Sequence, residues 1–90
     1  MAISVVFDFK GLTKGTYEKL IQGLIAAGAA PVGRTFHSAS EKPDGLLVVD
    51  VWESVEKFQA FGGKLMPIAQ GLSIAVPEPQ VFPTIAAVAG

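Results

Sequence analysis

The sequence predicts a small α+β domain whose elements follow the order strand, helix, strand, strand, helix, strand. Twice along the 90 residues, an apolar strand-like stretch is followed by a stretch with helical spacing of its apolar residues. The phrase "VVFDF" before "YEKL" also weakly resembles "VVDVW" before "VEKF". A chain of this length forms one domain, so we expect residues 1–90 to build a single core from two similar halves.

The first half begins with a strand and continues with a helix. Residues 3–9, "ISVVFDF", place four apolar side chains on one face, which is the period of a strand. From Tyr17 onward the apolar residues of segment 13–28 recur every three or four positions, as on one side of a helix. Thr13 is expected to cap the start of this helix and Gly28 its end.

A hairpin is predicted in the middle of the chain. Residues 34–40, "RTFHSAS", form a more polar strand, and residues 41–45, "EKPDG", have the composition of a tight turn. The next strand starts at Leu46 and continues through "LLVVDVW". These two strands are therefore expected to pair antiparallel.

The second helix is predicted to begin after Ser54 and to stop near Gly71. Gly62 and Gly63 weaken its middle, and Pro67 has no backbone N–H to donate. We therefore expect a kink or two short helices rather than one regular helix.

The last strand is predicted within residues 80–86, where Pro83 would be tolerated only at a sheet edge. Right-handed crossovers then favour a ferredoxin-like fold with a four-stranded antiparallel sheet of order 4-1-3-2. In it we place the first and third strands parallel to each other at the centre, and both helices on one face. Residues 46–49 are apolar without alternation, so both faces of that strand need cover, and we expect a homodimer formed through the sheet face.

Composition argues against several functions. The net charge of −1 and scattered Lys and Arg residues give no footprint for nucleic acid, and no apolar stretch is long enough for a membrane helix. Without cysteine there is no disulfide, thiol nucleophile or thiolate metal site. The N-terminus begins with a strand-like pattern rather than a basic leader, so we expect a cytoplasmic protein.

His37 is the first candidate catalytic residue, because imidazole is the side-chain group best suited to proton transfer near neutral pH. If the hairpin loop comprises residues 42–45, His37 lies opposite Asp50, whose carboxylate could orient the imidazole. If the loop comprises residues 41–45, His37 lies opposite Val49 and the pair is broken. The sequence leaves both registers open, and the alternative interpretation of His37 is a half-buried histidine without a catalytic role.

Asp50 is the second candidate, since a carboxylate within an apolar strand needs a partner. Trp52 could stack on a flat ligand or could belong to the core, and Tyr17 could offer a phenol to a pocket or simply pack. Arg34 is a candidate anion contact and Ser38 a candidate pocket hydroxyl. One histidine with dispersed carboxylates predicts no metal site, and no nucleotide-binding or nucleophile-elbow motif occurs.

The chain resembles the dimeric α+β barrel superfamily, in its antibiotic biosynthesis monooxygenase-like branch of short bacterial proteins. The resemblance lies in "VVFDFKGLTKGTYEKL", "GRTFHSAS", "LMPIAQGL", "PEPQVFP" and above all "VVDVWESVEKFQAF". It implies a ferredoxin-like subunit that pairs into a barrel, with a pocket between sheet and helices in each subunit.

The same resemblance implies several functions. The first is a cofactor-independent monooxygenase with a small apolar or aromatic substrate, in which His37 or Asp50 manages protons and Trp52 shapes the cavity. The alternative is a homodimer that binds a small ligand without transforming it, or that has a purely structural role. Haem degradation is a third and weaker hypothesis, because His37 would be the only imidazole ligand.

Overall fold

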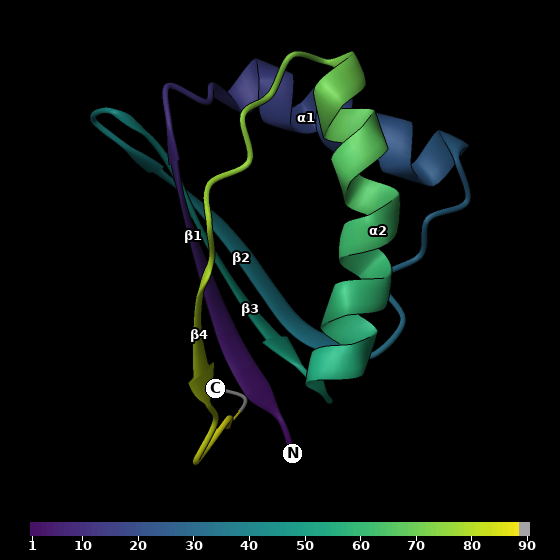
Figure 1. Ribbon diagram of the computed structural model, residues 1–90. Helices are drawn as coiled ribbons and strands as arrows, with labels where there is room; N and C mark the ends of the chain where they lie inside the picture. The colour runs from purple at the N-terminus through teal and green to yellow at the C-terminus, as the bar shows by residue number, and fades with distance from the viewer. Residues whose placement is uncertain (89–90) are drawn as a thin grey trace.

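The computed structural model describes residues 1–88, and its elements follow the expected order (Figure 1). Two helices and four strands make up the fold. Their bounds are β1 Ile3–Lys10, α1 Lys14–Ala26, β2 Arg34–Lys42, β3 Gly45–Trp52, α2 Val55–Gly71 and β4 Gln80–Pro83.

The four strands form one sheet in the order β2-β3-β1-β4, which is the predicted order 4-1-3-2. Every neighbouring pair is antiparallel, including the central pair β1 and β3, so the expected parallel orientation of these two strands was wrong. The crossover through α1 makes β1 and β2 parallel, and the hairpin then reverses the chain. Because β3 lies between β1 and β2, it must run antiparallel to both.

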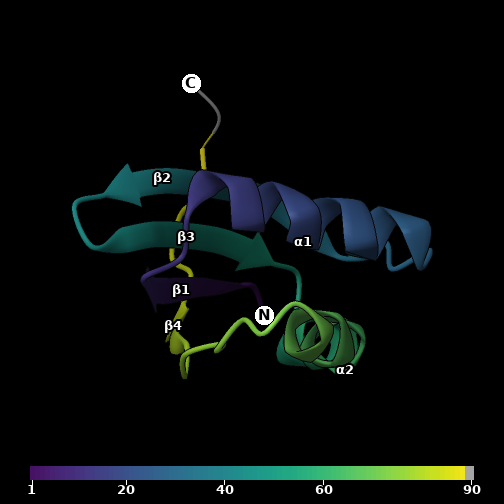
Figure 2. The same cartoon turned by 90° about the horizontal axis from the view of Figure 1, so that it is seen from above.

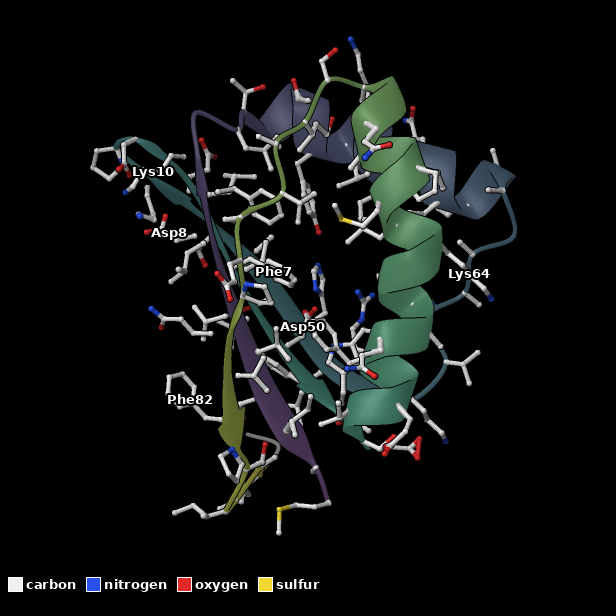
Figure 3. The ribbon with its side chains drawn as sticks, viewed as in Figure 1. Phe7, Asp8, Lys10, Asp50, Lys64 and Phe82 are labelled. Atoms are coloured by element: carbon white, nitrogen blue, oxygen red, sulfur yellow. The ribbon has the colours of Figure 1, made fainter. Side chains whose placement is uncertain are left out.

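Both helices lie on one side of the sheet, as predicted (Figure 1). In Figure 2, α2 is seen nearly end-on and α1 from the side, so their axes run in different directions. We call the sheet surface beneath them the helix face; Phe7 and Asp50 lie on it, while Phe82 projects from the opposite surface, the open face (Figure 3). Alternate residues of β1 and β3 are buried on the helix face, which confines the core to that side.

Helix α1 begins and ends where the sequence indicates. The Thr13 side chain accepts a hydrogen bond from the Thr16 backbone N–H at 3.2 Å, which satisfies one free donor of the first turn. Gly28, just beyond the helix, has a φ of +66°, a conformation that glycine adopts without strain. Leu20 and Leu24 are the buried residues of this helix and fix the face that it turns toward the sheet.

Helix α2 is a single helix that runs through Gly62, Gly63 and Pro67, so the predicted division into two short helices was wrong. Proline at position 67 removes only the hydrogen bond to the carbonyl of Gly63, a residue without a side chain to crowd the ring. Packing of the apolar stripe against the sheet offsets that loss. No helix among the described residues is long and apolar enough to cross a membrane.

The β2–β3 hairpin closes with Lys42 directly opposite Gly45. Gly45 has a φ of +155°, and a Cβ atom there would lie 1.9 Å from the backbone oxygen of Phe9. The Lys42 Nζ also donates to Asp8 Oδ1 at 2.6 Å, which ties the hairpin to β1. The short turn between these two residues sets the register of β2 against β3, and only a residue without a side chain fits at its end.

Candidate functional site

A cavity of about 400 Å³ lies between the helix face of the sheet and the two helices. Its walls are mostly apolar, with aromatic rings from β1 and α2 such as Phe7, Phe58 and Phe61. The segment after α2, from Val76 to Pro79, forms part of its rim. A cavity of this size and character suits a small aromatic or apolar molecule.

The hairpin register brings His37 directly opposite Asp50, as in the first of the two registers considered from the sequence. The His37 Nδ1 lies 2.5 Å from Asp50 Oδ1, and both residues line the cavity. The Asp50 side chain is only 6% exposed, so its negative charge is held away from water. The imidazole is the partner that a carboxylate in this strand requires.

Tyr17 completes a chain of three hydrogen-bonded side chains. Its hydroxyl lies 2.6 Å from His37 Nε2, and the two rings are stacked nearly parallel. Tyr17 stands in the first turns of α1, above the strand that carries His37, so helix and sheet each contribute to the chain. We refer to Tyr17, His37 and Asp50 together as the proton chain.

The proton positions follow from the chemistry of the three groups. An ionised carboxylate only accepts hydrogen bonds, so we assign the donor facing Asp50 to Nδ1 of His37. In a neutral imidazole the other nitrogen then has a free lone pair, and the Tyr17 hydroxyl donates to it. The chain can therefore accept a proton at the Tyr17 oxygen while the tyrosine proton passes to His37.

Tyr17 should titrate above free tyrosine. Burial raises the pKa of its hydroxyl above the ordinary 10.0, and the Asp50 charge acts in the same direction, whereas Arg34 opposes the rise. Above about pH 10 the unfolded chain releases this proton before the folded chain does, so the stability of the fold should fall as pH rises further. The phenolate absorbance of the single tyrosine measures this pKa directly; a midpoint at or below 10.0 would contradict the structure.

Trp52 lies at the wall of the cavity and is fully buried. Its ring packs against Phe58 and Phe61 at centroid distances of 5.8 and 5.3 Å, so it belongs to the core as well as to the cavity. Its indole N–H finds no acceptor within residues 1–88. The two interpretations considered from the sequence, ligand wall and core, are therefore compatible.

Arg34 and Ser38 lie on different faces of β2. Arg34 pairs with Trp52 and lines the cavity, with its guanidinium carbon 5.9 Å from the centre of the Phe61 ring. Ser38 pairs with Val49 on the open face and does not line this cavity. Of the six candidate residues, the structure brings five to one cavity and leaves Ser38 outside.

Helix α2 and the segment after it provide a part of the cavity wall that no sequence pattern identifies. Phe58, Phe61 and Leu65 recur in the sequence at helical spacing, which is equally typical of a core. Pro77 and Pro79 lie between α2 and β4, outside any helix or strand. None of these residues could be assigned to a cavity without knowing how α2 packs over the sheet.

Two adjacent glycines of α2 offer a test of the cavity. Gly62 lines it and Gly63 does not, and an added Cβ atom would meet no other atom within 4 Å at either position. Gly62→Ala and Gly63→Ala should each raise the free energy of unfolding by about 0.5–1 kcal/mol, because glycine weakens a helix interior. Only Gly62→Ala should also weaken binding of a naphthalene-type probe in calorimetry, and equal affinities of both variants would contradict the assigned wall.

No group of three or more His, Cys, Asp or Glu side chains within residues 1–88 is arranged to hold a metal ion.

Comparisons of the sequence with family models and with curated proteins found no match. Solved structures, in contrast, match over nearly the whole chain.

Three of these structures illustrate the likeness. SnoaB, a cofactor-independent oxygenase from Streptomyces nogalater, has a TM-score of 0.70 at 16% identity, over 97% of this chain and 96% of its own. A protein from Chloroflexus aurantiacus, provisionally assigned as an antibiotic biosynthesis monooxygenase, has a TM-score of 0.69 at 16% identity, over 99% and 98%. Rv0793 from Mycobacterium tuberculosis has a TM-score of 0.69 at 14% identity, over 99% and 100%.

The chain has the fold of the antibiotic biosynthesis monooxygenase-like proteins. This confirms the ferredoxin-like architecture expected from the sequence. Identities of 14 to 16% establish a fold and not a reaction, because one fold supports many activities. The reaction has to be argued from the cavity and the proton chain.

Proposed function

We propose that the protein is a cofactor-independent oxygenase that deprotonates a small aromatic substrate and lets the resulting anion react with molecular oxygen. The observation that carries this proposal is the proton chain, in which Tyr17, His37 and Asp50 are joined by hydrogen bonds of 2.6 and 2.5 Å at the wall of an apolar cavity. The description of SnoaB, which has the same fold, as a cofactor-independent oxygenase supports it.

The first step is proton removal from an acidic C–H of the substrate. The substrate proton passes to the Tyr17 oxygen as the tyrosine proton passes to His37 Nε2. The Asp50 carboxylate then stabilises the imidazolium through Nδ1. Because the walls are mostly apolar, the substrate anion is held away from water that would reprotonate it.

The second step uses electrons of the substrate itself. The substrate anion transfers an electron to oxygen, and the two radicals combine to form a carbon–oxygen bond, giving a peroxide. Protonation from His37 and loss of water then leave a carbonyl group on the carbon that carried two hydrogen atoms. One oxygen atom enters the product and the other leaves as water, so anthrone would give anthraquinone.

Oxygen consumption tests this proposal. Wild-type protein mixed with anthrone and related substrates that carry a CH2 group between aromatic rings should consume one molecule of oxygen per molecule of substrate and yield the quinone. The exposed Glu53→Gln variant is the control for nonspecific effects and should retain full activity. Lack of turnover across a broad panel would contradict the oxygenase proposal and favour the alternative, a ligand-binding or structural protein.

We also propose that two copies pair through the open face of the sheet. Leu47, Val49 and Val51 of β3 line this face, and Phe36 and Phe82 on the strands to either side are each 52% exposed. Contiguous exposed apolar patches of this kind mark interaction surfaces. A protein of the same fold from Thermobifida fusca is described as dimeric, at a TM-score of 0.56 and 14% identity. A second copy would cover the apolar strands symmetrically.

The mass of the protein in solution tests this pairing. Light scattering should give twice the chain mass for the wild type, and Val49→Asp should give a monomer, because two carboxylates would be buried without partners at the centre of the interface. The exposed Glu53→Gln variant should remain a dimer. A wild type that is monomeric at all concentrations would contradict the proposal.

A further inference from the structure

Arg34 lies on the cavity face only because β2 is irregular at its start. Strict alternation from His37 would place Arg34 on the opposite surface, beside Phe36. The strand instead has a bulge between Arg34 and Phe36, so that Arg34 pairs with Trp52 and Phe36 with Val51. Such bulges re-aim a side chain, and this one brings a cation into a mostly apolar cavity.

Within residues 1–88, the guanidinium of Arg34 has no anionic partner. No ion pair joins it to a carboxylate of residues 1–88, and its side chain donates no hydrogen bond within this part of the chain. It is half-buried beside the ring of Phe61. Five N–H donors in a planar fork are therefore left available to a ligand.

A second unused donor belongs to the residue paired with Arg34. The indole N–H of Trp52 is buried and finds no acceptor within residues 1–88. A buried donor without an acceptor costs roughly 1–3 kcal/mol. Arg34 and Trp52 both line the cavity and both have unpaired donors, whereas the carboxylate of Asp50 is already engaged by His37.

We infer that Arg34 forms a subsite for an ionised oxygen group, a carboxylate or a phenolate, carried on the aromatic ring system of the ligand. The inference deepens the oxygenase proposal by naming the substrate class, an aromatic acid. Trp52 and Asp50, the partners of Arg34 and His37, are two residues apart on β3, about 7 Å along the strand.

Charge on the ligand is the property to vary. Calorimetry compares 2-naphthoate with 2-naphthamide, which has nearly the same shape without the charge. The wild type should bind the acid about tenfold or more tightly than the amide, because hydrogen bonds between charged partners are roughly twice as strong as neutral ones. Arg34→Gln should remove this preference while keeping the affinity for the amide, and Arg34→Lys should retain part of it.

Lys64→Gln is the matched control, since it removes the same charge from the side of α2 that points away from the cavity (Figure 3). Its preference for the acid should equal that of the wild type. The inference is overturned if the wild type binds the amide as tightly as the acid, if Arg34→Gln keeps the preference, or if 2-naphthoate does not bind. Retained affinity for the amide shows that Arg34→Gln is folded.

The subsite and the oxygenase reaction can fail separately. Arg34-dependent binding of 2-naphthoate without oxygen consumption by any aromatic acid supports the subsite and contradicts the oxygenase proposal. Oxygen consumption with uncharged anthrone that is unchanged in Arg34→Gln, together with equal affinity for the acid and the amide, supports the oxygenase proposal and overturns the subsite.

Discussion

Replacement of His37 by Gln is expected to lower the turnover number for oxygen consumption by about 10²–10⁴-fold, the usual contribution of a general base. Glutamine has a similar volume and can still donate a hydrogen bond to Asp50, but it does not accept a proton at neutral pH. The imidazole is only 23% exposed, so the variant should be checked by thermal unfolding. The turnover number is measured with an oxygen electrode at saturating substrate.

Asp50→Asn separates the base from the group that orients it. The amide oxygen can still accept from Nδ1 of His37, so the imidazole keeps its position, but no negative charge stabilises the imidazolium. We expect a loss of turnover smaller than that of His37→Gln with the Michaelis constant nearly unchanged. If His37→Gln instead keeps a turnover number within twofold of the wild type, the substrate proton is accepted by a group other than His37.

Gly45→Ala is expected to have the largest effect on stability, lowering the free energy of unfolding by about 3 kcal/mol or more. At a φ of +155° an added Cβ is strained, and it would lie 1.9 Å from the Phe9 backbone oxygen, which belongs to the central strand β1 and cannot move aside. Urea unfolding measures the loss. Since this turn sets the register of β2, the remaining folded protein should also have a weakened contact between His37 and Asp50.

Gly11→Ala is the matched control for Gly45→Ala. Gly11 also has a positive φ, +77°, but an added Cβ there would meet no other atom within 4 Å. Only the strain of the left-handed conformation remains, so the loss should be about 1 kcal/mol. Equal losses for the two variants would contradict the role assigned to the contact between Gly45 and Phe9.

Most of the fold was predictable because its signals are local. The alternation in β1, the cap at Thr13 and the edge position of Pro83 each depend on neighbouring residues only. The continuity of α2 was not predictable, because packing over the sheet outweighs the local effects of Gly62, Gly63 and Pro67. The antiparallel direction of β1 and β3 follows from the crossover and the hairpin taken together. Neither connection alone specifies it, which is why the two strands were expected to be parallel.

The site was predictable as a set of residues but not as an arrangement. Sequence alone left two hairpin registers open, and a slip of one residue decides whether His37 meets Asp50. The bond between Tyr17 and His37 depends on the placement of α1 over β2, which no local pattern specifies. The same hairpin register that places His37 opposite Asp50 directs the Ser38 side chain to the open face.

The proton chain can be tested without knowing the substrate, because His37 is the only histidine. The measurement is ¹⁵N nuclear magnetic resonance of its imidazole at a pH where the ring is neutral. We expect a proton on Nδ1, facing Asp50, and an unprotonated Nε2 whose resonance shifts when Tyr17→Phe removes the hydroxyl donor. A proton on Nε2, or an Nε2 resonance unaffected by Tyr17→Phe, would contradict the chain and with it the proposed reaction.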